Sequence, residues 1–247
     1  MGGKVQVMVS GGAPLNKEVM DFFKVVFRVP FLEAYGQTEG TGAEFSTFGF
    51  ERFSGTVGSV FEHMEFKLVD VPEMDYYNTD KDEQGNPTPR GELWVRGPSI
   101  IKGYYKMPEK DKELMSGDWM MSGDIVMLTH PNKSLKIIDR KKHIFKLSQG
   151  EYVAPEKLEN IYKSADPLIA NVYIYGNSNN DYIVGAINIE LGQLKNFAKK
   201  MGVGENEGLE SEALNKAVLE LLEKFHKDNK LNGIERVRKV ILSEIDW

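Results

Sequence analysis

The sequence predicts an α/β fold, with a strand, glycine turn and helix at the start, a β-rich middle and an α+β end. Its 247 residues, 41% of them hydrophobic, are enough for one large domain or two smaller ones with their own cores. Ten of the 24 glycines lie at or before Gly58, which predicts turns and close backbone approaches in that part.

The start of the chain predicts a strand followed by a helix. Val5, Val7 and Val9 alternate with polar neighbours, as in a short strand. Ser10-Gly11-Gly12 ends this strand, and Pro14 suits the first turn of a helix, because its missing N–H leaves no bond unmade there. Apolar residues then recur at helical spacing until Pro30. They are Leu15, Val19, Phe22 and Val26.

From residue 56 to about 140 the pattern changes to short β-like runs, which predict a small β subdomain or barrel. The stretch Asn78 to Arg90 is rich in Asp, Gly, Asn and Pro and predicts an exposed loop. The clearest strand runs are Phe66–Val69, Glu92–Val95 and Leu135–Ile138.

The last third predicts a small α+β domain, joined to the rest at about residues 139–142. A helix begins near Pro155, with Leu158, Ile161 and Tyr162 on one face. Two β-like runs follow, over 171–175 and 182–189. A long helix covers roughly 209–230. Its apolar stripe is Leu214, Val218, Leu221, Leu222 and Phe225.

Composition excludes several classes of protein. No apolar run is long enough for a helix that spans a bilayer, and the first residues lack the features of a secretory signal. The absence of cysteine excludes disulfides, thiolate catalysis and cysteine-ligated zinc. A net charge of −6 argues against nucleic-acid binding. We therefore expect a soluble, cytoplasmic protein.

Two glycine-rich segments are candidates for binding a nucleotide. The turn Ser10–Pro14 can present backbone N–H groups to a phosphate, but such turns also serve merely to lead a strand into a helix. In Tyr35–Glu39, Tyr35 can stack on a base, Thr38 offers a hydroxyl and Glu39 an oxygen ligand for Mg²⁺. The same segment also fits an ordinary helix N-cap.

Asp124 and Arg140 are candidates for binding a ribose. A carboxylate can accept hydrogen bonds from both hydroxyls of a ribose, and an arginine further along the chain can brace them. Taken alone, Asp124 after Gly123 is a common turn residue, and the basic run 140–143 is a common solvated surface.

The order of the motifs decides between these interpretations. The chain reads SGGAPL, YGQTEG, GELWVRGP, WMMSGD and IDRKKHIFKLSQGEYVAPEKLE. This series resembles the adenylate-forming enzymes, and within them the eukaryotic long-chain acyl-CoA synthetases (long-chain fatty acid–CoA ligases). The resemblance extends over essentially all 247 residues, and residues 138–159 are its most specific part.

The resemblance implies a domain plan. Residues 1–139 would be the C-terminal part of the large AMP-binding domain, an α/β layered domain with a β-rich, barrel-like subdomain at about 56–139. Residues 140–247 would be the mobile α+β lid domain, incomplete at its end.

The resemblance also implies an activity, with ATP and CoA as co-substrates. ATP and a fatty acid form an acyl-adenylate and pyrophosphate, and the acyl group then passes to the thiol of CoA, releasing AMP. Gly12, Ala13 and Pro14 would line the adenine pocket. Tyr35, which is followed by Gly36, would stack on the base. Asp124 and Arg140 would hold the ribose.

The remaining residues implied by the resemblance are catalytic or belong to the lid. Thr38 would bond the α-phosphate, and Glu39 would hold Mg²⁺ bridging ATP oxygens. Lys142 falls at the hinge of the lid, and Ser148, Gln149 and Gly150 would face the CoA channel.

Two parts of the resembled enzymes have no counterpart in these residues. These are the Ser/Thr/Gly-rich phosphate loop and the lysine used in adenylation. We therefore expect a fragment of a longer enzyme that is inactive by itself. Membrane attachment, for example at the cytosolic face of the endoplasmic reticulum, would need segments outside this chain. The alternatives are a ligase for another carboxylic acid and a non-catalytic module that binds a nucleotide or CoA.

Overall fold

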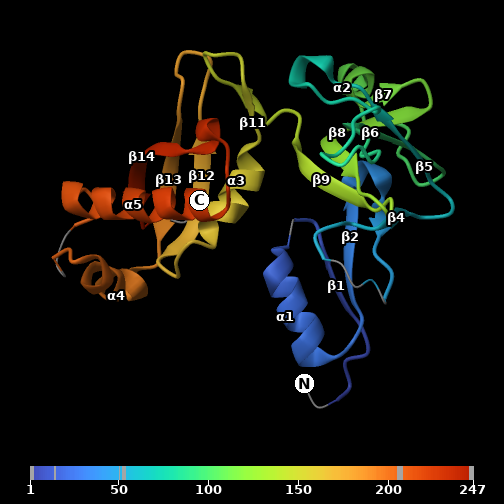
Figure 1. The fold of residues 1–247 in the computed structure, drawn as a ribbon. Coiled ribbons are helices and arrows are strands. Elements are labelled where there is room, and N and C mark those ends of the chain that lie inside the picture. Colours follow the sequence, from blue (N-terminus) through green and yellow to red (C-terminus); the bar gives the residue numbers. More distant parts are fainter. Residues whose placement is uncertain (1–2, 14, 50, 52–53, 205–207, 245–247) are drawn as a thin grey trace. The chain divides into compact units, whose positions relative to one another are not determined.

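The computed structural model describes residues 3–13, 15–49, 51, 54–204 and 208–244. It divides into two compact units, Met1–Lys141 and Lys142–Trp247 (Figure 1). The division lies slightly beyond the expected domain boundary at 139. Each unit has its own apolar core and is described by itself.

The first unit begins with a four-stranded sheet in the order β1-β2-β3-β4. β1 and β2 are parallel and are connected by helix α1, whereas the other neighbours are antiparallel. The short 3₁₀ turn η1 (Thr38–Gly40) joins β2 to β3. The elements are β1 (Met8–Gly11), α1 (Lys17–Phe27), β2 (Phe31–Gln37), β3 (Gly42–Ser46) and β4 (Ser59–Val60).

The strand and helix expected at the start are present but begin later than predicted. The strand starts at Met8 rather than Val5, and the helix starts at Lys17. The reason is the cap: the side chain of Asn16 accepts a hydrogen bond of 2.8 Å from the backbone N–H of Glu18, which makes Asn16 the N-cap. Pro14, expected in the first helical turn, lies outside the described residues.

A second, antiparallel sheet completes the first unit, with β8 at its centre. β8 pairs with β6, β7 and β9. Among the described residues β5 pairs only with β6, so the expected barrel is observed as an open sheet. The elements are β5 (Glu65–Val69), η2 (Pro72–Met74), β6 (Arg90–Arg96), α2 (Pro108–Leu114), β7 (Met115–Ser116), β8 (Trp119–Leu128) and β9 (Leu135–Arg140).

The two sheets of the first unit are joined by hydrogen bonds and by a shared core. The N–H of Val57 donates to the carbonyl of Leu135, whose own N–H donates to Gly58, both over 2.8 Å. Phe45 of the first sheet and Leu93 of the second belong to one buried cluster. Because this packing holds the two sheets together, residues that extend from both can form one site.

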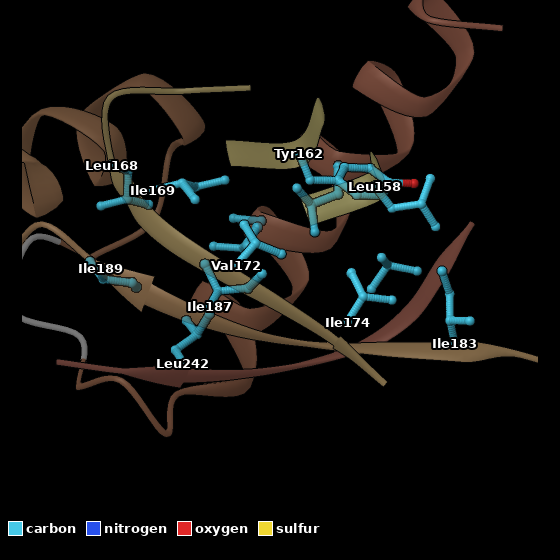
Figure 2. Packing of buried hydrophobic residues seen from close by; sticks show 14 of the residues in the cluster. Leu158, Tyr162, Leu168, Ile169, Val172, Ile174, Ile183, Ile187, Ile189 and Leu242 are labelled. Atoms are coloured by element: carbon cyan, nitrogen blue, oxygen red, sulfur yellow. The ribbon is translucent and has the colours of Figure 1, made fainter. Parts of the chain in front are cut away.

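The second unit packs three helices with a three-stranded sheet in the order β12-β13-β14. Figure 2 shows Leu158 and Tyr162 of α3 lying among the apolar side chains of the sheet, such as Val172. The hydroxyl of the buried Tyr162 donates to the carbonyl of Glu235 over 2.8 Å. The elements are β10 (Phe145–Lys146), β11 (Tyr152–Val153), α3 (Pro155–Lys163), β12 (Ile169–Tyr175), β13 (Ile183–Ile189), α4 (Leu191–Met201), α5 (Glu212–Asp228), η3 (Gly233–Glu235) and β14 (Val237–Ser243).

Sequence patterns found most of the second unit but missed α4 and β14. The long final helix is shorter than the expected 209–230, because Ser211 caps it and its last helical residue is Asp228. Strand β14 pairs in parallel with β13, so its place in the sheet depends on a partner that is distant in the sequence. Within the described residues, no helix combines the length and the apolar character needed to cross a membrane.

The predicted apolar stripe of α1 is largely exposed. In this helix only Met20 is buried, whereas Val19, Phe22, Val25 and Val26 are between 41% and 73% exposed. Clustered apolar side chains on a surface favour association. We therefore predict that the 247-residue chain associates with itself as its concentration rises, and that changing Phe22 and Val25 to glutamine reduces this association in sedimentation velocity.

Ile241 provides the control for this prediction. It is 70% exposed but lies on β14 in the second unit. An Ile241→Thr variant should associate like the unchanged chain. If it loses association as strongly as the α1 variant, the α1 surface is not the cause.

Candidate functional site

The centre of the candidate site is the pairing of β8 with β9. In this register Asp124 lies directly opposite Arg140. The Nε of Arg140 lies 3.4 Å from Oδ1 of Asp124, and the hydroxyl of Tyr35 donates to Oδ2 of the same carboxylate. Three residues expected to bind the adenosine are therefore brought together from β2, β8 and β9.

Burial makes this carboxylate a fixed acceptor. Asp124 is only 4% exposed, and its backbone N–H donates to Oγ of Ser122 over 3.1 Å. Ser122 in turn donates to the carbonyl of Leu93 over 2.6 Å. Burial, together with the negative charge of Asp124, raises the pKa of Tyr35 well above its ordinary value. The phenol of Tyr35 thus remains a protonated donor at neutral pH.

The backbone at Gly36 leaves no space for a side chain. A Cβ at this position would lie 1.9 Å from the carbonyl oxygen of Gly42 on the adjacent strand β3. Any other residue would push β2 and β3 apart at the point where Tyr35 reaches Asp124. Gly36 is therefore required by strand packing.

Glu39 lies in the turn η1, at the end of β2. Its carbonyl accepts a hydrogen bond of 2.8 Å from the N–H of Ile101, and its Oε1 accepts one from the hydroxyl of Tyr104. The hydrogen bond to Glu39, followed by burial, raises the pKa of Tyr104 to about 12. Thr38 begins the same turn, and its carbonyl accepts from the N–H of Thr41 over 3.0 Å.

Glu44 is a third acidic residue of this region, and the sequence did not point to it. It is completely buried on β3, and neither of its carboxyl oxygens has a hydrogen-bond partner among the described residues. A Cβ on Gly40 would lie 1.9 Å from its Oε1, so its carboxyl group lies against the turn η1. Burial, with the negative charges of Asp124 and Glu39, raises the pKa of Glu44 to about 7.

The charges of this region fit a bound cation. The charges of Asp124 and Glu39 both act on Glu44, whereas Arg140 is a cation paired with Asp124. Carboxylate oxygens are also the ligands that Mg²⁺ prefers. That Glu39, on the turn, supplies such a ligand stays a prediction.

The remaining residues expected to bind adenine lie at the end of β1. Gly12 follows β1 with a φ of +84°, and both Gly12 and Ala13 are exposed. Pro14 is not among the described residues. No contact brings Gly12 or Ala13 to Asp124 within the described part of the chain, so their role stays a prediction.

In the second unit, Ser148, Gln149 and Gly150 form the turn between β10 and β11. The N–H of Ser148 donates to the carbonyl of Asn180 over 3.0 Å, and the N–H of Gly150 donates to Leu147 over 3.0 Å. Gly150 has a φ of +93°, which favours glycine. All three residues are exposed, as a binding loop requires.

Lys141 ends the first unit and is held there by three contacts. Its Nζ lies 3.1 Å from Oε2 of Glu92 and 3.5 Å from Oε1 of Glu73. Its N–H donates to the carbonyl of Gly123 over 2.8 Å. Lys142, the expected hinge, has no hydrogen bond or ion pair with other described residues. The chain is thus anchored up to the residue before the expected hinge.

Comparison with known proteins gives matches that together cover the whole chain. The AMP-binding enzyme family matches residues 1–105. Long chain acyl-CoA synthetase 7, peroxisomal, of Arabidopsis thaliana is 40% identical over 247 residues, which is 100% of this chain and 31% of that protein. Long-chain-fatty-acid–CoA ligase 1 of Cavia porcellus is 41% identical over 98% of this chain and 34% of that ligase.

A solved structure is similar over the same range. The adenylation domain of carboxylic acid reductase from Segniliparus rugosus, in complex with AMP and a co-purified carboxylic acid, has a TM-score of 0.79 and 31% identity. The match covers 100% of this chain and 35% of that one.

The chain is similar to adenylate-forming enzymes: residues 1–105 match the AMP-binding enzyme family, and the whole chain matches the adenylation domain of a carboxylic acid reductase. Over 98–100% of its length the chain is also similar to long-chain acyl-CoA synthetases, which are 38–41% identical to it. It spans about a third of the length of the curated relatives it matches.

The buried Glu44 leads to a prediction about stability and pH. Its folded-state pKa of about 7 lies above the ordinary value of 4.5, so the unfolded chain releases this proton first as the pH rises. The free energy of unfolding therefore falls between pH 4.5 and pH 7 on account of Glu44. Glu44→Gln should remove this loss and stabilise the chain at pH 8, relative to pH 5, by about 1 to 3 kcal/mol.

Urea unfolding of both proteins at pH 5 and pH 8 measures this difference. Glu109→Gln is the control, because the side chain of Glu109 is 83% exposed. A stability difference between Glu44→Gln and the unchanged chain that is the same at both pH values would contradict a raised pKa.

Proposed function

We propose that this chain is the nucleotide-binding part, with the C-terminal unit, of a long-chain fatty acid–CoA ligase. The enzyme joins ATP and a fatty acid into an acyl-adenylate, releasing pyrophosphate, and then transfers the acyl group to CoA, releasing AMP. The observation that carries the proposal is the shared contact of Tyr35 and Arg140 with the buried carboxylate of Asp124. The phosphate loop and the adenylation lysine of such ligases are not among these residues, so we expect this chain alone to make no acyl-CoA.

The adenosine would be held by residues of the first unit. Asp124 accepts hydrogen bonds from the ribose hydroxyls, and Arg140, whose side chain is 61% exposed, braces them from the neighbouring strand. The ring of Tyr35 stacks on the base, while Gly12, Ala13 and Pro14 line the adenine pocket. The resemblance of the motifs supports these last roles.

The phosphates would lie at the turn η1. The hydroxyl of Thr38 bonds the α-phosphate, and Glu39 supplies an oxygen ligand for Mg²⁺. When bound, Mg²⁺ offsets the negative charge that develops on the phosphates during attack by the fatty-acid carboxylate. The surplus of carboxylates around Glu39 supports a cation at this place.

The second unit would serve the second half-reaction. Lys142 is the hinge about which this unit moves between the two half-reactions, and Ser148, Gln149 and Gly150 face the CoA channel. A glycine suits a narrow channel for the thiol arm of CoA, because it occupies little room. The anchoring of Lys141 supports a pivot that begins at the next residue.

A second candidate is an enzyme that activates a different carboxylic acid. The 31% identity to the adenylation domain of a carboxylic acid reductase favours it, although the acyl-CoA synthetases are 38–41% identical. Competition between palmitate and short or aromatic acids for adenylation by the complete protein separates the two. We place the ligase in the cytoplasm, with any attachment to a membrane made by segments outside these residues.

Nucleotide binding by the chain itself tests the proposal. We predict that the chain binds AMP and that Asp124→Asn weakens this binding about tenfold or more, because a charged acceptor is lost. The unchanged chain should also bind 2′-deoxy-AMP more weakly than AMP, and this preference should vanish in Asp124→Asn. Isothermal titration calorimetry measures all four affinities.

Asp118→Asn is the control for this experiment, since Asp118 is exposed and lies outside the site. Thermal unfolding shows whether each variant is folded. If folded Asp124→Asn binds AMP like the unchanged chain, the ribose role of Asp124 is wrong.

The hinge gives a separate prediction in the complete enzyme. Lys142→Pro fixes the backbone angle φ of this residue at about −65° and should restrict movement about it. We expect ATP–pyrophosphate exchange to survive, while thioester formation falls by at least about tenfold, as for a lost gating movement. Equal loss of both half-reactions in a folded variant would refute the assignment of Lys142.

A further inference from the structure

Tyr104 is hydrogen-bonded to the candidate metal ligand, and nothing in the proposed mechanism uses it. Its hydroxyl donates to Oε1 of Glu39, although the two residues are 65 positions apart. The other oxygen, Oε2, has no hydrogen bond or ion pair with any described residue. The carboxylate of Glu39 is thus held by one oxygen and open at the other.

The contact is part of a wider connection between two segments. The N–H of Ile101 donates to the carbonyl of Glu39 over 2.8 Å, and the hydroxyl of Thr41 donates to the carbonyl of Ser99 over 2.9 Å. The segment between β6 and α2 therefore binds the turn η1 through both backbone and side chains. These hydrogen bonds fix the position of the backbone at Glu39.

Tyr104 is itself held in place. Its N–H donates to Oδ1 of Asp111 over 2.7 Å, and Asp111 lies in α2. The preceding residue, Gly103, has a φ of +148°, and a Cβ there would lie 2.7 Å from the carboxyl group of Asp111. Glycine thus allows α2 to approach closely enough to fix Tyr104.

We infer that Tyr104 is a positioning residue: its hydroxyl holds Oε1 of Glu39 and leaves Oε2 as the oxygen that binds a divalent cation. The last torsion of a glutamate side chain is broad, so a free carboxylate would lose rotational freedom on binding the cation. The hydrogen bond from Tyr104 restricts this torsion of Glu39 before the cation binds. This inference rests on the metal role proposed for Glu39.

Tyr105 is a matched control. It is the neighbouring tyrosine, it is 85% exposed, and the Nζ of Lys106 lies 5.1 Å from the centre of its ring. Tyr104→Phe and Tyr105→Phe each remove one hydroxyl from the same segment. Only the first removes a hydrogen bond to Glu39.

The experiment uses Mn²⁺ as the probe, with the 247-residue chain and AMP, and measures free Mn²⁺ by electron paramagnetic resonance. Tyr104→Phe should weaken Mn²⁺ binding about tenfold, as is typical when a partner of a metal ligand is lost. Tyr105→Phe should bind like the unchanged chain, and Glu39→Gln should lose the site. Unchanged or tighter binding by Tyr104→Phe, with the site lost in Glu39→Gln, overturns the inference and leaves the metal role of Glu39 intact.

The Glu39→Gln arm tests the proposed function separately. If this variant binds Mn²⁺ like the unchanged chain, or if the unchanged chain binds none, the metal role of Glu39 is wrong and the inference is wrong with it. A second readout needs no metal: the ¹³C resonance of the Glu39 carboxyl group, identified by its loss in Glu39→Gln, should move in Tyr104→Phe and stay in Tyr105→Phe. An unmoved resonance in Tyr104→Phe overturns the inference.

A fourth variant covers the case in which Tyr104→Phe does not fold. Asp111→Asn keeps the phenol but weakens the hold on the backbone of Tyr104. It should weaken Mn²⁺ binding by a smaller factor, about threefold, because its effect reaches Glu39 through Tyr104. Binding equal to that of the unchanged chain would again overturn the inference.

Discussion

The hydrogen bond from Tyr35 to Asp124 is the interaction on which the candidate site depends. Tyr35 lies on the first sheet and Asp124 on the second, so this bond connects the two sheets where the site forms. It acts together with the β8–β9 register, which sets Arg140 opposite Asp124. A shift of this register by one residue would turn Arg140 to the other face of the sheet and break the group apart.

Negative charge is concentrated around this bond. Asp124 and Glu39 each accept a hydrogen bond from a tyrosine, whereas Glu44 is buried behind the turn with no such partner among the described residues. Phenol donors stabilise a carboxylate in a poorly solvated place, because they replace part of its lost hydration. Glu44 lacks this compensation, and its pKa is raised accordingly. Such a region attracts cations. An anion such as a phosphate binds there more favourably when a metal ion binds with it.

The strongly patterned parts of the fold could be predicted from the sequence. The strands around Phe66, Glu92 and Leu135, the helix at Pro155 and the long final helix are all present. Helix α4 and strand β14 were missed, since the position of β14 is set by β13 rather than by its own pattern. The exposure of the apolar side chains of α1 could not be predicted from the sequence either. Periodicity predicts that a helix has an apolar face but not which part of the protein covers that face.

The sequence by itself determined the identities and order of the motif residues, and hence the resemblance to long-chain acyl-CoA synthetases, because glycine turns, carboxylates and basic residues at these spacings occur in a recognisable series. It also indicated that Asp124 and Arg140 act as a pair. The tertiary structure alone decided what surrounds them: Tyr104 rather than Tyr105 holds Glu39, and Glu44 lies buried against the same turn. The contact of Tyr104 with Glu39 joins residues 65 positions apart, and that of Tyr35 with Asp124 joins residues 89 positions apart. No local pattern encodes these two long-range contacts, since they arise only when distant segments of the first unit pack together.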